Sequence, residues 1–246
     1  MIQLDLTGWC SCQCQKNGVE VKKNPLVKYN TNSTGAAVQA EKAGLGFIFS
    51  DQARSSELWY RWVFDQFRNL QHQPDQQIAT IEELIRNTIG YYWELGERLQ
   101  SPIVSLFIQG GDCDDMAIMA VTIAETLGHE ARFKFIRVDG SPGWHVYAEA
   151  RNGMKPDSPW IPIDPSMPIG KRGYDIPQAK ILESLPFDRQ SVAHIQFPAH
   201  IVAAIWAHPR QIVTLEGGTL AAAGINYLRA EDLTLFPDDA AGKLID

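Results

Sequence analysis

The chain has 246 residues, 45% of them hydrophobic and 21% charged, with a formal net charge of -7 and a pI of about 5.4. This balance is typical of a globular protein with a sizeable apolar core, built as one domain with additions or as two small domains. No long Lys/Arg run is present, which argues against a nucleic-acid partner, and the longest apolar runs are far too short to span a membrane.

The N-terminal sequence "MIQLDLTGWC" lacks the basic start and apolar core of a secretory signal, so we expect a reducing compartment without disulfides. Cys10, Cys12 and Cys14 would share one face of an extended segment, where a soft metal ion could bind them. No fourth ligand is adjacent, so an unmetallated, oxidation-prone segment is the preferred interpretation. We expect neither a metal nor another cofactor.

Residues 1–50 are predicted to form an irregular N-terminal arm, because residues 11–50 are polar and Gly-rich and show no long apolar period. A helical pattern follows within residues 55–70, with a serine as its candidate cap. Its apolar positions are Leu58, Trp62, Phe64 and Phe67.

A second helical pattern covers residues 80–99. It begins at Thr80, and Glu83 three residues later completes a capping-box pattern. Pro102 ends the pattern, because proline cannot continue a helix. The apolar stripe consists of Ile81, Leu84, Ile85, Ile89 and Trp93.

A third helix is predicted from the stretch "GGDCDDMAIMAVTIAETLG". Asp112 is a strong N-cap candidate, which makes Cys113 the first helical residue. Residues 116–127 are apolar nearly all round, so this helix should be buried, and a glycine follows as its stop. Asp114 and Asp115 fall in the first turn, where we expect them to point into solvent.

Beyond this helix, apolar and polar residues alternate with the two-residue period of β-strands. Three strands are predicted at residues 131–138, 144–150 and 160–164. The later signals are weaker. They predict short helices near residues 177–184 and 198–207 and a strand at 211–217.

Cys113, His145 and Asp164 form a candidate catalytic set. A nucleophilic cysteine needs a thiolate, a base that pairs with it, and a group that orients the base. Taken singly, a cysteine at a helix start is more often structural, a strand histidine is usually exposed, and an aspartate before proline is usually a turn residue. The ordered combination of the three makes nucleophilic catalysis the stronger interpretation.

The strand phase tests whether the histidine and the aspartate can meet. His145 and Tyr147 share one face of their strand. An antiparallel pairing that places Tyr147 opposite Pro162 also places His145 opposite Asp164, with Cβ atoms about 4.5–5.5 Å apart. A slip of one residue would put the two on opposite faces.

A calcium loop is the alternative explanation for the aspartates. An EF-hand that begins at Asp112 would need glycine at position 117 and glutamate at position 123, where the chain has Ala117 and Ile123. The aspartates are therefore better explained as capping and first-turn charges.

The motifs "GGDCDDMA…LG", "WHVYAEA" and "WIPIDPS" resemble the transglutaminase-like superfamily of cysteine peptidases over roughly residues 78–170. The resemblance implies catalytic roles for Cys113, His145 and Asp164. It also implies a papain-like α+β core, in which a helix bearing the cysteine packs on an antiparallel sheet bearing the other two. Similar chains encoded among bacteriophage and prophage genes imply a location in the bacterial cytoplasm or on the virion, with phage structural proteins as partners.

The expected function is thiol-dependent acyl transfer that hydrolyses peptide, amide or isopeptide bonds of a protein or peptide substrate. A cross-linking transglutaminase and a phage assembly protein with an idle domain are the alternatives. The expected oxyanion donors are the Cys113 N–H and the Gln109 amide. The catalytic core is expected at residues 51–185, with a C-terminal extension packed on it at 186–246.

The charge around the thiol raises a further expectation. Carboxylates near Cys113 disfavour a thiolate, whereas the helix N-terminus and a protonated His145 favour it. We expect the favourable charges to win while His145 is present, and the thiol to return to an ordinary or raised pKa without it.

Overall fold

The computed structural model describes residues 34–91, 97–141, 143–197, 199–207, 212–215 and 226–227. The predicted Cys10–Cys12–Cys14 array, the first 33 residues of the predicted arm and Trp93 of the predicted helical stripe lie outside this part of the chain. None of the helices described there combines the length and the apolar character needed to cross a membrane.

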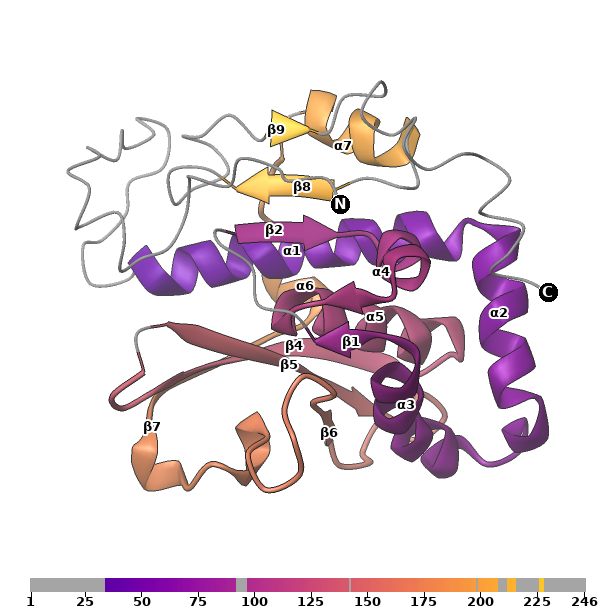
Figure 1. The fold of residues 1–246 in the computed structure, drawn as a ribbon, viewed down its shortest axis with the longest axis horizontal. Coiled ribbons are helices and arrows are strands. Elements are labelled where there is room, and N and C mark those ends of the chain that lie inside the picture. Colours follow the sequence, from indigo (N-terminus) through magenta and orange to yellow (C-terminus); the bar gives the residue numbers. More distant parts are fainter. Residues whose placement is uncertain are drawn as a thin grey trace.

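The centre of the fold is a four-stranded antiparallel sheet with the strand order β6-β5-β4-β7 (Figure 1). The three predicted strands are confirmed as β4 (Glu130–Val138), β5 (Trp144–Arg151) and β6 (Ile161–Ile163). The prediction of a helix near residues 177–184 is wrong, because only one 3-10 turn forms there before strand β7 (Ile181–Phe187). Strand β7 pairs with the second edge of β4, whose backbone groups would otherwise lack partners.

The helix predicted at the cysteine is confirmed as α5 (Cys113–Thr126). It packs on β5 and β4 from one side and on helix α1 from the other, and Figure 1 shows it between them. Its side chains from Met116 to Ala124 are buried on every face of the helix, as the unbroken apolar run predicts. Helix and sheet together give the expected α+β fold.

Helix α1 (Thr34–Arg54) corrects the prediction of an irregular arm, which is wrong for residues 34–50. The helix also runs across the predicted domain boundary after residue 50. Its glycines serve close packing: a Cβ on Gly46 would lie 2.6 Å from the Phe133 ring, so only glycine allows this approach to the sheet. Glycine is a poor helix former, and its presence here hides a buried helix from propensity-based reasoning.

Helix α2 (Glu57–Phe67) forms where predicted, but its buried face is shifted. Trp59, Val63 and Phe67 are buried, whereas Leu58 and Phe64 are about half exposed. Only Phe67 of the expected stripe therefore lies in the core. The true stripe follows the i, i+4, i+8 spacing, which the many aromatic residues of this segment obscure. A 3-10 turn, η1 (Arg68–Leu70), leads out of the helix.

Helix α3 (Pro74–Thr88) starts six residues earlier than the predicted capping box. Pro74 occupies the first helical turn, where a missing N–H is tolerated, and the Thr80 hydroxyl donates to the Gln76 carbonyl inside the helix at 2.7 Å. The helix also ends earlier than the pattern suggested. The predicted Ile81 and Ile85 of its stripe are buried.

Short elements connect α3 to α5. Strand β1 (Gly90–Tyr91) pairs in parallel with β3 (Gly110–Gly111), and strand β2 (Glu97–Gln100) precedes α4 (Pro102–Ile108). The expectation that Pro102 ends the helix before it is wrong, because α3 has already ended at Thr88 and Pro102 instead begins α4, with the Ser101 hydroxyl accepting the Val104 N–H.

Elements after residue 185 contact the rest of the fold. The predicted helix and strand are confirmed as α7 (Ala199–Ala207) and β8 (Ile212–Leu215), and β8 pairs with β2 and with β9 (Asn226–Tyr227). Helix α7 and the short α6 (Arg189–Val192) both pack on α1.

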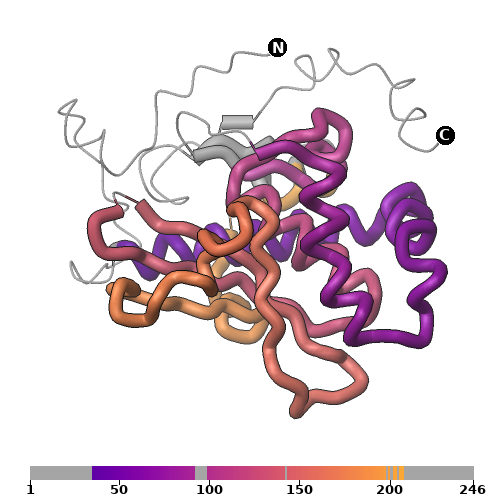
Figure 2. Tube along the Cα trace, turned by 60° about the horizontal axis from the view of Figure 1, so that its bottom comes forward, coloured from indigo at the N-terminus to yellow at the C-terminus, as the bar shows by residue number. Residues whose placement is uncertain are grey.

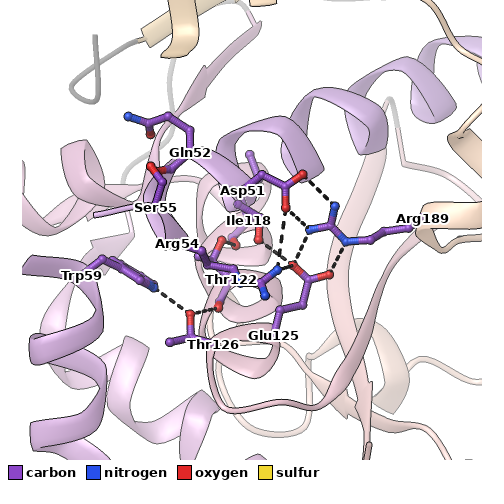
Figure 3. A network of polar contacts seen from close by, with 11 residues as sticks. Asp51, Gln52, Arg54, Ser55, Trp59, Ile118, Thr122, Glu125, Thr126 and Arg189 are labelled. Carbon is purple, nitrogen blue, oxygen red and sulfur yellow. Dashed lines mark hydrogen bonds and ion pairs between the residues drawn. The ribbon is translucent and has the colours of Figure 1, made fainter. Parts of the chain in front are cut away.

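A polar network ties α6 to α1 and α5 (Figure 3). Arg189 donates two hydrogen bonds to Asp51, at 2.9 and 2.8 Å, and two to Glu125, at 2.6 and 2.7 Å. Glu125 also accepts the Ser50 hydroxyl at 2.6 Å. Such charge-assisted, multidentate contacts fix three helices in one arrangement.

Candidate active site

Cys113 is the first residue of α5, as predicted, and its thiol is free and partly buried. The Asp112 carboxylate accepts the backbone N–H groups of Asp114 and Asp115, at 3.1 and 3.5 Å. Asp115 completes a capping box by accepting the Asp112 N–H at 3.3 Å. On the sheet side, the backbone N–H of Val146 donates toward the sulfur, which places the thiol against the residue that follows His145.

The expectation that Asp114 and Asp115 point into solvent is wrong. Both are buried. Asp115 accepts the backbone N–H of Gln100 at 2.9 Å and also its side-chain amide. Asp114 pairs with Lys42 of α1 at 2.9 Å. These carboxylates are therefore held by protein groups, and solvent does not screen them from the thiol.

The surroundings of Cys113 oppose a thiolate, so the expectation that the favourable charges win at this thiol is wrong. Burial raises the pKa of the thiol well above its ordinary value, and the negative charges of Asp114 and Asp112 raise it further. Lys42 and the Val146 N–H act in the opposite direction without reversing the shift. Asp114 Oδ1 lies 3.9 Å from Sγ. The sulfur therefore holds its proton at neutral pH until a base removes it.

His145 and Asp164 meet as predicted, with Nε2 and Oδ2 2.7 Å apart. The register that brings them together differs from the expected one, because Pro162 lies opposite Glu149 and not opposite Tyr147. The displacement is two residues, which leaves every side chain on its predicted face. His145 and Asp164 are thus diagonal rather than direct neighbours, a spacing that an imidazole ring can span.

The Asp164 carboxylate is fully buried and accepts two further hydrogen bonds, one from the Ser166 hydroxyl at 2.7 Å and one from the Gly173 N–H at 2.6 Å. Burial alone would raise its pKa, but the hydrogen bond and charge of His145 and the other two donors lower it overall. Asp164 is therefore ionised and can only accept. His145 Nε2 must carry the donated proton, which leaves Nδ1 as the nitrogen available to a base-catalysed step.

Tyr91 is a site residue that the sequence did not reveal. Burial raises its pKa to about 12, with further contributions from the negative charges of Asp112, Asp114 and Asp164. The residue is nevertheless 45% exposed, and its phenol stays protonated at neutral pH. Its backbone is fixed by pairing with Gly111, two residues before the cysteine. The helical pattern of residues 80–99 includes Tyr91, which lies in a strand instead, and no local signal marks it.

Gln109 lies at the C-cap of α4 in the left-handed conformation, with φ 54°. Gln109 is exposed. Its backbone carbonyl accepts the Gly90 N–H at 3.0 Å, and this bond connects the start of β1 to the end of α4. A left-handed non-glycine residue is uncommon and strained. Its role as an oxyanion donor stays a prediction.

Comparison with known proteins matches residues 61–165 to the model of the Transglutaminase-like superfamily. This range contains Cys113, His145 and Asp164, and the match supports a cysteine-dependent enzyme. The crystal structure of a candidate cysteine protease from Cytophaga hutchinsonii aligns at 16% identity with a TM-score of 0.43. The alignment covers 71% of this chain and 53% of that one, so it spans about half of the other protein. No curated protein matches the chain.

Proposed function

We propose that the protein is a thiol-dependent acyl-transfer enzyme that hydrolyses peptide, amide or isopeptide bonds. Cys113 is the nucleophile, His145 the general base and acid, and Asp164 the group that orients the imidazole. The observation that carries the proposal is the 2.7 Å bond between His145 Nε2 and the buried, ionised Asp164, formed next to the strand backbone that contacts the cysteine.

The first step follows from the charges at the site. Because the thiol is protonated at rest, His145 Nδ1 takes the proton from Sγ as sulfur attacks the carbonyl carbon. The imidazolium that forms is stabilised by the Asp164 carboxylate on its other nitrogen. The N–H of Cys113, at the positive end of α5, is the proposed donor to the oxyanion.

The second step completes the transfer. His145 gives its proton to the leaving amine, and a thioester between substrate and Cys113 remains. Water, activated by the same imidazole, then attacks the thioester and releases the acid together with the free thiol. An amine in place of water would give a new amide bond, so acceptor access decides between hydrolysis and cross-linking.

An activity profile on mixed peptide and isopeptide substrates tests the proposal. Wild-type protein is expected to release amine and to form a thioester adduct on the Cys113 peptide, detected by mass spectrometry, whereas Cys113→Ala does neither. His145→Ala should fold normally, yet lose turnover and label more slowly with iodoacetamide at neutral pH. Equal turnover by Cys113→Ala, or equal labelling of wild type and His145→Ala, would refute the assignment. A primary amine added to the assay separates hydrolysis from cross-linking.

A further inference from the structure

The chain between β6 and β7 contacts β5 and is drawn in orange in Figure 2. Residues 170–175 of this segment, here called the latch, include the 3-10 turn η2 (Gly173–Asp175) and pack against β5. The latch lies beyond residues 61–165, where the chain matches the superfamily.

Gly173 is the point at which the latch contacts the His145–Asp164 pair. Its N–H donates to Asp164 Oδ2 at 2.6 Å, the same oxygen that His145 Nε2 contacts. A Cβ at this position would lie 2.6 Å from Tyr147 and 3.1 Å from the Cδ2 of His145. Only a residue without a side chain can bring its N–H to the carboxylate without displacing the Tyr147 ring and pressing on the imidazole.

Glu82 of α3 anchors the latch. Its Oε2 accepts the Tyr174 hydroxyl at 2.9 Å and also the backbone N–H of Asp164 at 3.0 Å. Its Oε1 pairs with Arg86 at 2.9 Å and with Arg172 of the latch. A single carboxylate therefore connects the latch to the backbone of Asp164.

The latch is also braced internally and by aromatic rings. Gly170 adopts a left-handed conformation, with φ 79°, and its N–H donates to Asp175 Oδ2 at 2.8 Å. The Tyr174 ring meets the Tyr147 ring edge to face, with centroids 6.0 Å apart, and Tyr147 lies 6.2 Å from the His145 ring. Side chains thus run from the latch to the imidazole in unbroken contact.

We propose that residues 170–175 act as a positioning latch for the His145–Asp164 pair, with Gly173 setting the geometry and Tyr174 docking the latch on Glu82. The inference rests on the proposed function and adds positioning residues outside the matched domain. Gly173→Ala should lower kcat by about 100-fold with KM little changed, because a displacement of about 1 Å at a catalytic group has this effect. Tyr174→Phe keeps the ring and removes one charge-assisted hydrogen bond, and it should lower kcat by roughly tenfold.

A spectroscopic readout separates positioning from general stability. The proton shared by His145 Nε2 and Asp164 should give a downfield ¹H NMR signal that is absent in His145→Ala. We expect this signal to be lost or to exchange faster in Gly173→Ala and Tyr174→Phe. It should persist in Gly143→Ala, where a Cβ meets nothing within 4 Å, and in Tyr60→Phe on α2. If Gly173→Ala fails to fold, the result for Tyr174→Phe decides.

The outcomes distinguish the latch from the function it serves. An unchanged signal and unchanged kcat in folded latch variants, with Cys113→Ala inactive, would overturn the latch and leave the proposed function standing. A lost signal in those variants, with wild type and Cys113→Ala equally inactive, would refute the proposed function and leave the positioning of the pair confirmed.

Discussion

Asp114→Asn should make the Cys113 thiol more reactive. Among the described residues, Asp114 is the charged group that most strongly raises the pKa of this thiol, after the effect of burial. Its Oδ1 lies 3.9 Å from Sγ, while its Oδ2 holds the ammonium of Lys42 at 2.9 Å. The substitution removes a nearby negative charge and leaves Lys42 to favour the thiolate.

Coulomb's law sets an upper limit on the increase in the reaction rate of the thiol. Two unit charges 3.9 Å apart interact by about 4 kcal/mol at an effective dielectric constant of ~20, and Lys42 already offsets part of this. A less basic thiolate is also a weaker nucleophile, and a Brønsted slope of about 0.5 cancels roughly half of the gain. About 2 kcal/mol remains at most, which corresponds to roughly 30-fold in rate. We expect an increase between about threefold and this limit.

Iodoacetamide labelling at neutral pH measures the change. Peptide-level mass spectrometry separates Cys113 from Cys10, Cys12 and Cys14. Asp65→Asn on the exposed face of α2 is the matched control, because it makes the same substitution far from the sulfur. Lys42→Met should change the rate in the opposite direction. An unchanged or lower rate in Asp114→Asn with a native circular dichroism spectrum would refute the electrostatic explanation.

Three further variants test the packing and charge of the fold. Because hydrogen bonds and the charge of His145 outweigh burial and lower the pKa of Asp164, its contribution to stability is present above its ordinary pKa and is lost as pH falls through the lowered value. Acid unfolding of Asp164→Asn should therefore depend less on pH than that of wild type, and identical pH profiles would contradict this. Glu125→Gln removes the buried carboxylate at the centre of a partly exposed ion-pair network and should cost about 1–2 kcal/mol of unfolding free energy in urea, whereas a cost near zero would make the network incidental. Gly46→Ala should destabilise by about 1–3 kcal/mol despite the better helix propensity of alanine, because its Cβ would clash with Phe133; a gain in thermal midpoint would contradict this.

The parts of the fold that could be predicted from the sequence are those set by residues close together in the chain. The cap at Asp112, the start of α5 at Cys113 and the left-handed glycine after α5 depend on backbone groups within one or two turns. The strands beside the site are equally predictable, because the alternation of apolar and polar residues assigns each side chain to one face of the sheet. These local rules place the candidate nucleophile at a helix start and His145 and Asp164 on one sheet face.

The parts that could not be predicted depend on tertiary contacts. Helix α1 contains glycines that permit close approach to the sheet, and composition alone cannot separate this use from a flexible arm. Strand β7 forms because an open edge of β4 is available to pair with it. The burial of Asp114 depends on Lys42, 72 positions away in the sequence. Local patterns therefore could not predict that this carboxylate acts on the thiol.

The contact between His145 and Asp164 is predictable from the sequence although the expected strand register is wrong. A slip of two residues moves Asp164 by one pleat repeat along β5 but returns it to the same face, where an imidazole can still reach it. A slip of one residue would have separated the pair completely. An alternating sequence therefore determines which face of the sheet each side chain occupies. The choice among registers that differ by two residues depends on loop length and on contacts outside the strands. Here Glu82 and Gly173 hold Asp164 from its backbone and its carboxylate, and both lie outside the two strands whose pairing they help to fix.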